Sequence, residues 1–373
     1  MNKMKRVLIF SLAYEPVIGG AEVAVKEITS RINDMEFDLV TKRFSETHKK
    51  EERINNVNVY RIDSSKLFFP IKAYLFGSKL HLQKPYEVVW SIMAAYAGFA
   101  TLFFKMRFPK VKYVLTLQEG DPIGHIKRRA FFVTPLFKKI FLKADVIQVI
   151  SNYLGDFARG MGYAGRVEVI PNGVDVKKFA NNKNEQHRVL LKDNIVLITT
   201  SRLVEKNAVG DIIEALKYLE TNVELHIVGI GPLESALKLK AKSLQLEARV
   251  KFLGFIKYED IPNYLHEADI FIRPSLSEGM GNSFIEAMAA GLPVIATPVG
   301  GIVDFLKDPS TSSGQAATGL FCKVQNPESI AEQVKKLINN PELKLKLIEN
   351  ASRMVREKYE WDLVARDMKE RVF

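Results

Sequence analysis

The sequence predicts an α/β protein with two Rossmann-like, doubly wound domains that face each other across a cleft. One observation is a rhythm in which short β-branched runs alternate with stretches of helical periodicity, which is typical of parallel sheets covered by helices. A second is that this rhythm stops in a polar stretch at 177–188 and then starts again. A third is the length, because 373 residues exceed what one hydrophobic core ordinarily serves.

The first domain is expected over 1–180. Its strands are predicted at RVLIFSL, which a helix over 21–32 follows, and then at FDLVT, VNVYRI, EVVWS, KYVLTL and DVIQVIS. The second domain is expected over 189–355, with strands at NIVLITTS, VELHIVG, VKFLGF, DIFIRPS and PVIAT. A last helix over 356–373, anchored by Trp361, is expected to pack back on the first domain.

Composition favours a globular enzyme of a reducing compartment. Apolar residues make up 47% and charged residues 26% of the chain, which excludes a disordered or fibrous protein. The single cysteine, Cys322, excludes an intramolecular disulfide and a cysteine zinc cluster. The apolar runs at 7–14 and 88–104 are interpreted as buried elements and not as a signal peptide or a membrane span. We therefore predict a cytoplasmic protein.

Positive charge is concentrated in the first half of the chain. The net charge is +11, and the residues through Ala180 include 29 Lys and Arg against 17 Asp and Glu. This balance suits an anionic membrane surface or a phosphorylated acceptor, or it is a well-solvated surface. The segment 127–143 interleaves basic and bulky apolar residues around Pro135, as either an interfacial helix or a helix with buried aromatics would. Peripheral contact with the inner face of an anionic membrane is therefore one of two open interpretations.

Two loops carry residue types that suit phosphate. Gly19 and Gly20 lie between the first strand and a helix, where free N–H groups and the helix dipole favour an anion. A structural turn is the alternative, and the spacing departs from G-x-G-x-x-G, which argues against a dinucleotide-binding oxidoreductase. Arg202 and Lys206 follow the first strand of the second domain, where two cations could neutralise a diphosphate. A solvated loop is the alternative there.

The most specific pattern is PSLSEGMGNSFIEAMAAGLPVIAT. Glu278 lies in a loop after the strand DIFIRPS, and Glu286 lies eight residues later on the helix that follows. Ser283 and Glu286 also fit a capping box, which is a purely structural reason for the second carboxylate. The capping box leaves Glu278 unexplained, because this residue lies in a glycine-containing loop where exposed N–H groups and a helix N-terminus converge.

These ordered motifs resemble those of the family 4, group 1 retaining glycosyltransferases of the GT-B fold. The resemblance covers nearly the whole chain, from Gly19-Gly20 through IPNGVD, SRLVEKN, VGIGPLE and LGF to the E-x7-E segment and GLPVIATPVGG. It implies transfer of a sugar from a nucleotide diphosphate-sugar to an acceptor hydroxyl with retention of anomeric configuration. The acceptor could be a glycan, a lipid-linked sugar or a small molecule, and neither a cofactor nor a nucleic acid partner is implied.

The resemblance also implies roles for individual residues. Arg202 and Lys206 would hold the diphosphate as negative charge builds on it. Glu278 would bind hydroxyls of the donor sugar, and Glu286 would bind those of the ribose. The backbone would approach the nucleotide and its phosphates at the remaining candidates: Gly19, Gly20, Gly229, Gly231, Gly279, Met280, Gly281, Asn282 and Ser283.

Two positions depart from the family pattern. Many members have a lysine five residues after the arginine, where this chain has Asn207 and carries Lys206 one place earlier. The loop LTLQEGDP has Gln118, Glu119 and Asp121 where many members carry a histidine near the reacting sugar. Whether this loop contacts the acceptor or is a structural turn is open.

The implied mechanism needs neither a protein nucleophile nor a metal. The acceptor hydroxyl attacks from the face that the diphosphate leaves, and the leaving phosphate receives the proton, so that catalysis rests on orientation and charge stabilisation. Asp34, Glu36 and Asp38 alternate near a strand and are interpreted as solvated instead of as a D-x-D metal site. Two alternatives stay open: a nucleotide-sugar epimerase with the same donor cleft, and a non-catalytic basic binding module.

Overall fold

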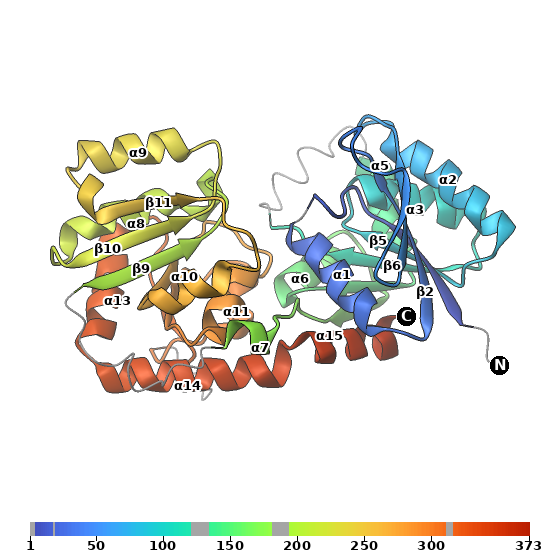
Figure 1. Cartoon of the computed structure of the whole chain (residues 1–373). Coiled ribbons are helices and arrows are strands. Elements are labelled where there is room, and N and C mark those ends of the chain that lie inside the picture. The colour runs from blue at the N-terminus through green and yellow to red at the C-terminus, as the bar shows by residue number, and fades with distance from the viewer. Residues whose placement is uncertain (1–3, 18, 121–133, 181–193, 311–315) are drawn as a thin grey trace. The chain divides into compact units, whose positions relative to one another are not determined.

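The computed structural model describes residues 4–17, 19–120, 134–180, 194–310 and 316–373. The chain divides into two compact units (Figure 1): Met1–Asn172 together with Trp361–Phe373, and Gly173–Glu360. Within these described residues each unit contains one sheet, and the strands in both sheets are parallel apart from one edge pair. The predicted α/β class with two parallel-sheet domains is therefore confirmed.

The first unit contains a sheet of eight described strands in the order β3-β4-β2-β1-β5-β6-β7-β8. These are β1 (Lys5–Phe10), β2 (Met35–Lys42), β3 (Glu51–Ile54), β4 (Val57–Ile62), β5 (Val88–Ile92), β6 (Lys112–Leu117), β7 (Val146–Val149) and β8 (Arg166–Val169). The sequence analysis did not predict β3, which pairs antiparallel with β4 at the edge of the sheet. Its sequence, EERI, is mostly charged and largely exposed, so it has no apolar pattern.

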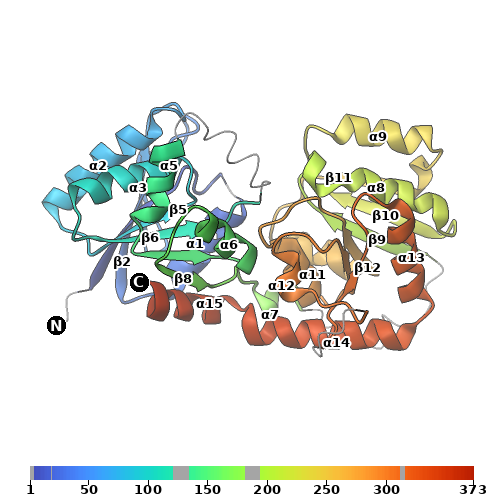
Figure 2. The same ribbon diagram turned by 180° about the vertical axis from the view of Figure 1, so that it is seen from behind.

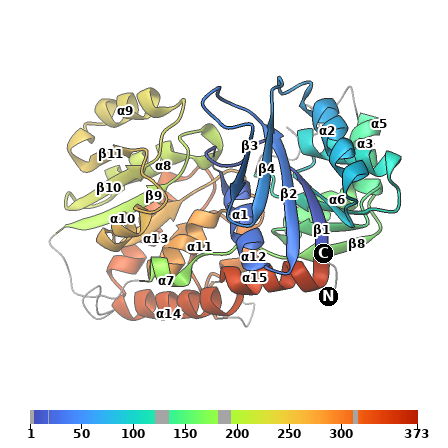
Figure 3. The same ribbon diagram turned by 45° about the vertical axis from the view of Figure 1, so that its right-hand side comes forward.

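Helices cover both faces of this first sheet (Figure 3). They are α1 (Gly20–Arg31), α2 (Phe69–Gln83), α3 (Tyr96–Arg107), α5 (Thr134–Leu142) and α6 (Asn152–Gly160). Alternate side chains of β1 point to opposite faces of the sheet. On one face Val7 and Ile9 pack in an apolar cluster that also contains residues of α1. Phe10 instead packs edge-on against Phe104 of α3, with ring centroids 6.0 Å apart. Coverage on both faces explains why the residues of β1 from Val7 to Phe10, and all of β5 except Ser91, are apolar.

The C-terminal residues are part of the first unit's core. Helix α15 (Trp361–Asp367) packs against α1, and Asp362 accepts a hydrogen bond from Arg31 at 2.7 Å. The Phe373 ring lies 4.9 Å from that of Trp90, and the Phe373 backbone oxygen accepts from the Lys5 ammonium at 2.7 Å. The last thirteen residues thus stabilise the sheet to which the N-terminal strand belongs.

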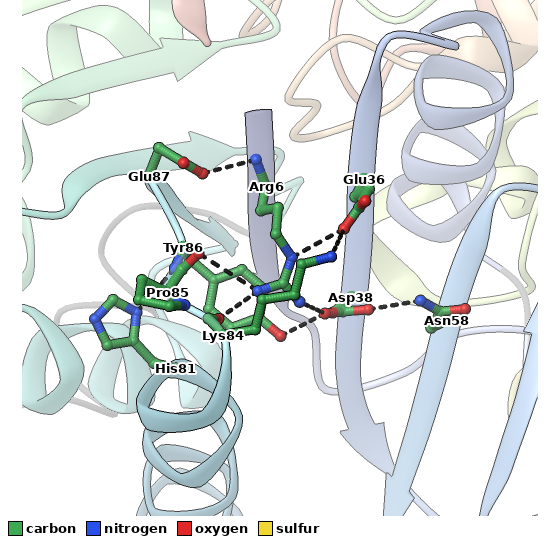
Figure 4. Close-up of polar contacts among 9 residues, drawn as sticks. All are labelled: Arg6, Glu36, Asp38, Asn58, His81, Lys84, Pro85, Tyr86 and Glu87. Atoms are coloured by element: carbon green, nitrogen blue, oxygen red, sulfur yellow. Dashed lines mark hydrogen bonds and ion pairs between the residues drawn. The ribbon is translucent and has the colours of Figure 1, made fainter. Parts of the chain in front are cut away.

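A buried polar network holds the amino end of β1 (Figure 4). Arg6 donates to the Asp38 carboxylate at 2.7 Å and to Glu36 at 3.0 Å. Asp38 also accepts from the Tyr86 hydroxyl at 2.5 Å and from Asn58 at 2.8 Å. The interpretation of Asp38 as solvated is therefore wrong, because its side chain is buried and an arginine of the neighbouring strand neutralises it.

The second unit contains a parallel sheet of six described strands in the order β11-β10-β9-β12-β13-β14. They are β9 (Ile195–Thr200), β10 (Val223–Val228), β11 (Val250–Gly254), β12 (Ile270–Arg273), β13 (Val294–Ala296) and β14 (Leu320–Phe321). The described residues of this unit also include several helices and one short 3₁₀ turn, η3 (Glu205–Asn207). The helices are α7 (Val176–Phe179), α8 (Val209–Ala215), α9 (Glu234–Ser243), α10 (Ile261–Glu267), α11 (Asn282–Ala289), α12 (Ile302–Phe305), α13 (Pro327–Ile338) and α14 (Pro341–Lys358).

Helices also lie on both faces of the second sheet (Figure 2). Side chains of α8, α9 and α13 share one apolar cluster with β9, β10 and β12. On the other face Phe284 of α11 packs against Phe271 of β12, with ring centroids 5.6 Å apart. The division at Asn172 comes slightly before the boundary suggested at residue 180, because α7 packs on α11 of the second unit. Most of the polar stretch at 177–188 lies outside the described residues.

No helix among the described residues is long and apolar enough to cross a membrane.

Candidate functional site

The carboxyl edge of the second unit's sheet gathers two of the three candidate segments. β9 and β12 are neighbours in this sheet, so the loops that leave their carboxyl ends meet, as expected at a topological switch point. The backbone N–H of Leu276, after β12, donates to the carbonyl of Lys206, after β9, at 2.7 Å. Asn207 donates from its side-chain amide to the Arg202 carbonyl at 2.6 Å. The Arg202–Lys206 segment and the Glu278 loop are thus joined.

The side chain at the centre of this arrangement is Arg273, the last residue of β12, which the sequence analysis did not single out. It forms an ion pair with the Glu278 carboxylate and donates to the Ser283 hydroxyl at 2.7 Å. Its second Nη atom also donates to the Asn207 side-chain oxygen at 3.1 Å. A charged residue at the end of an otherwise apolar buried strand, IFIR, was the available signal, since such charges are seldom buried without a partner.

Glu278 is buried, and its backbone is fixed by a glycine pair that follows β13. The N–H of Gly301 donates to the Glu278 carbonyl at 3.1 Å. Gly300 has a φ of +54°, and a Cβ at this position would lie 1.9 Å from the same carbonyl oxygen. Only glycine fits such an approach. The sequence contains this pair within its family-like motifs, but its packing on Glu278 could not be read from spacing.

Helix α11 does not begin with the capping box that the sequence suggested. Its N-cap is Gly281, with a φ of +86° and no side-chain cap. Ser283 and Glu286 lie inside the helix, and the Ser283 hydroxyl accepts from Arg273 instead. The structural reason offered for Glu286 is therefore wrong. Of the other candidates here, Gly279 and Met280 are buried, and Asn282 is half-buried as the first helical residue.

Glu286 is half-buried on α11 and its titration is perturbed. Burial raises the pKa of its carboxyl to about 7, and the positive charges of Arg273 and Lys178 oppose that rise. A carboxyl whose pKa burial has raised towards neutral is a common feature of functional sites. Arg202 is exposed and Lys206 half-buried at the same edge, so both cations can meet a ligand.

Gly229 and Gly231 follow β10, and the chain's own backbone occupies the space that a Cβ would need. A Cβ on Gly229 would lie 2.0 Å from the Ser201 carbonyl oxygen, and one on Gly231 would lie 2.4 Å from that of Leu203. Packing of this loop against the loop after β9 therefore requires both glycines. Contact with a nucleotide at these positions stays a prediction.

Gly19 and Gly20 lie in the first unit, exposed between β1 and α1. The Glu22 carboxylate occupies the first turn of α1 and lies 2.8 Å from where a Cβ of Gly19 would be. Burial raises the pKa of Glu22, and the backbone N–H groups of Glu22 and Gly19 partly offset the rise. The Glu22 carboxylate thus already accepts hydrogen bonds from the backbone N–H groups at this helix end, and its negative charge would repel an approaching anion.

The loop of Gln118 and Glu119 is tied to the first unit's backbone. Gln118 accepts from the side-chain amide of Asn172 at 3.1 Å, and Glu119 accepts from the backbone N–H of Ala94 at 2.9 Å. These bonds favour a structural role for both residues. Asp121 lies outside the described residues.

The described part of the chain contains no group of three or more His, Cys, Asp or Glu side chains that could hold a metal ion.

Comparison with known families matches almost the whole chain in two parts. The family "Glycosyltransferase Family 4" matches residues 18–178, and the family "Glycosyl transferases group 1" matches residues 181–354. An uncharacterized glycosyltransferase of Methanocaldococcus jannaschii is 27% identical over 96% of this chain and 95% of its own length. A GDP-mannose-dependent monoacylated α-(1-6)-phosphatidylinositol monomannoside mannosyltransferase of Corynebacterium glutamicum is 27% identical over 91% of each chain.

Solved structures share the fold over nearly the full length. Sucrose-phosphate synthase of Thermosynechococcus elongatus has a TM-score of 0.82 at 20% identity, with 98% of each chain covered. HepE of Anabaena, solved in complex with UDP-glucose, has a TM-score of 0.78 at 19% identity, again with 98% of each chain covered. The order of motifs, the two parallel-sheet units and both family matches agree, and the chain belongs to the family 4, group 1 glycosyltransferases and has the GT-B fold.

Proposed function

We propose that this glycosyltransferase is a retaining, metal-independent enzyme that transfers a hexose from a nucleotide diphosphate-sugar to an acceptor hydroxyl. The observation that carries the proposal is the convergence of the Arg202–Asn207 segment, the Glu278 loop and the start of α11 at one sheet edge. Relatives named as GDP-mannose-dependent mannosyltransferases and a neighbour solved with UDP-glucose support a nucleoside diphosphate-hexose as donor.

In this proposal the exposed Arg202 and the half-buried Lys206 stabilise the departing diphosphate as its charge develops. Fixed positive charge does this without the reorganisation that water would need. Glu278 accepts hydrogen bonds from hydroxyls of the donor sugar, and Glu286 accepts those of the ribose. Backbone N–H groups from Gly279 to Ser283 complete the phosphate cradle. The acceptor oxygen then attacks the anomeric carbon from the leaving-group side, and its proton passes to the diphosphate.

The proposal is tested with a panel of UDP- and GDP-hexoses, scored by release of nucleoside diphosphate with and without glycan or lipid-linked acceptors. We expect release to depend on an acceptor, to persist in EDTA and to give a product with the donor's anomeric configuration by NMR. Inversion or loss of turnover on chelation would overturn the retaining or the metal-independent part. Accumulation of an epimerised sugar nucleotide without acceptor would instead identify an epimerase.

We further propose that a cytoplasmic enzyme of this kind works at an anionic membrane, where a lipid-linked acceptor would be found. Helix α2 supports this with exposed apolar side chains on one face and just before it: Leu67, Phe68, Ile71, Leu75 and Leu82. Lys66, Lys72 and Lys79 are exposed among them, and between Asp63 and Glu119 the only acidic residue is Glu87. An apolar stripe with a basic border suits an anionic lipid surface.

The membrane proposal predicts salt-sensitive co-sedimentation with vesicles that contain phosphatidylglycerol and little with pure phosphatidylcholine. The variant Phe68→Ser with Leu75→Ser should lose this binding. Leu239→Ser removes a leucine of α9 that is 67% exposed, compared with 59% for Phe68 and 53% for Leu75, and should keep the binding. Equal binding by all three proteins would exclude α2 as the contact.

A further inference from the structure

We propose that Arg273 is a positioning residue of the transfer reaction, whose guanidinium fixes Glu278, Ser283 and Asn207 in one arrangement at the donor end of the site. The inference rests on the proposed function, because it concerns how the same carboxylates are held. Arg273 is distinct from Arg202 and Lys206, which we place against the diphosphate, since it acts through other residues.

The geometry is that of one fork with three partners. Nη1 donates to Ser283 at 2.7 Å, and Nη2 donates to Asn207 at 3.1 Å and forms the ion pair with Glu278. The three partners belong to separate pieces of chain: the first turn of α11, the end of η3 and the loop after β12. The planar donors of a guanidinium suit such divided contacts, whereas an ammonium supplies one point charge.

Burial makes this arrangement rigid. The side chains of Arg273 and Glu278 are 11% and 6% exposed, so water can do little to solvate either charge. Removing one partner of a buried ion pair is strongly destabilising, so each of these side chains holds the other in place. An ionised carboxylate only accepts hydrogen bonds and offers about four lone-pair sites. Glu278 can therefore pair with Arg273 and still accept from sugar hydroxyls.

The charge of Arg273 also reaches the second glutamate. Of the two positive charges that oppose the raised pKa of Glu286, Arg273 has the larger effect and Lys178 on α7 the smaller. The two carboxylates of the E-x7-E pattern thus share one counter-charge, although of these two carboxylates Arg273 forms a direct ion pair with Glu278. Loss of Arg273 should leave Glu286 protonated to a higher pH.

Asn207 connects the guanidinium to the arginine–lysine segment. Its amide group donates to the Arg202 carbonyl at 2.6 Å while its oxygen accepts from Arg273. Asn207 is buried and occupies the position at which the sequence departs from the family's lysine. In this chain the cation next to that position is Arg273 of β12. The Asn207 side chain links this guanidinium to the Arg202 backbone. Arg273 and Asn207 therefore act as one unit.

The test compares Arg273→Met and Arg273→Lys with wild type in donor turnover and in nucleoside diphosphate affinity from pH 6 to 9. Arg273→Met should lower kcat by about 10²-fold, as misplacement of reacting groups does. It should also move the acidic limb of the binding profile to higher pH, because Glu286 then needs a higher pH to ionise. Arg273→Lys should recover the pH profile, since it keeps the charge, but only part of kcat, since it loses the fork.

A matched control separates these effects from loss of stability. Arg249 is another partly buried arginine of the second unit, and its hydrogen bonds within the described residues go to backbone carbonyls, among them those of Val223 and Leu216. Arg249→Met should lower the urea midpoint without moving the pH profile. The inference would be overturned if Arg273→Met kept the kcat and the pH profile of the wild type. It would also be overturned if Arg273→Met lowered kcat while its pH profile, like that expected for Arg249→Met, did not move. Absence of nucleotide binding and turnover in the wild type would instead refute the proposed function.

Discussion

Substitution of Gly300 by alanine perturbs the backbone of Glu278 without touching a side chain of the proposed site. The new Cβ would lie 1.9 Å from the Glu278 carbonyl oxygen and 2.9 Å from its carbonyl carbon. Both atoms belong to backbone, so they can move away only if the loop that carries Glu278 moves. The φ of +54° adds a second cost for a residue with a side chain.

The expected loss of stability follows from these two terms. A left-handed backbone costs a non-glycine residue about 1–2 kcal/mol, and overpacking typically costs about 1–3 kcal/mol. Gly300→Ala should therefore destabilise the second unit by about 2–5 kcal/mol. Donor affinity should fall as well, because relief of the clash displaces Glu278 from its pairing with Arg273.

Urea unfolding can assign this loss to one unit. Both tryptophans of the chain, Trp90 and Trp361, belong to the first unit, so their fluorescence follows that unit while far-UV circular dichroism follows both. Gly210→Ala is the matched control, because a Cβ there would meet its nearest atoms at 3.6 Å within α8, where alanine is neutral or stabilising by up to about 1 kcal/mol. If Gly300→Ala unfolds and binds nucleotide as wild type does, the contact with Glu278 is not the constraint that we describe.

Three further predictions concern charge. Glu278→Gln should reduce turnover by about 10²-fold with an unchanged circular dichroism spectrum, and wild-type rates of nucleoside diphosphate release would remove Glu278 from the site. Nucleotide binding near pH 7 should release protons, because hydroxyls that donate to Glu286 favour its charged form and lower a pKa that burial has raised to about 7. Calorimetry in buffers of different ionisation enthalpy measures this proton release, and Glu286→Gln should abolish the release. Asp38→Ala should destabilise the first unit by about 3–5 kcal/mol, because it leaves Arg6 buried without its main partner, and an unchanged fluorescence midpoint would show that Glu36 suffices.

The periodic parts of the fold could be predicted from sequence because their physical cause is local. A strand buried on both faces must be apolar along its length, and the runs that contain β1, β5, β9 and β12 meet that requirement. The edge strand β3 was not predicted, because an exposed edge strand does not need an apolar sequence. For the same reason the antiparallel pair of the first sheet was missed.

The candidate site was predictable only in part, since its contacts join residues far apart in the chain. Arg202 and Glu278 could be singled out because they lie in the motifs SRLVEKN and E-x7-E, which resemble those of the family. Arg273 was not singled out, although it ends an apolar strand, because its partners on η3 and α11 become visible only in the folded structure. The predicted capping box at Ser283 was wrong for a related reason. The local pattern allows it, but α11 begins after Gly281 and the Ser283 hydroxyl accepts a hydrogen bond from Arg273 of β12.

Several glycines of the family-like motifs fix loops by close packing on backbone. Gly229 and Gly231 pack on the backbone of Ser201 and Leu203, and Gly300 packs on that of Glu278. A chain could keep all three glycines, and hence the loops, while losing the charges that we propose stabilise a diphosphate. We therefore expect the glycines to maintain the fold, and we propose that activity depends on Arg202, Glu278 and their neighbours. For this reason substitutions of charged side chains, and not of glycines, discriminate between an active transferase and an inactive relative with the same fold.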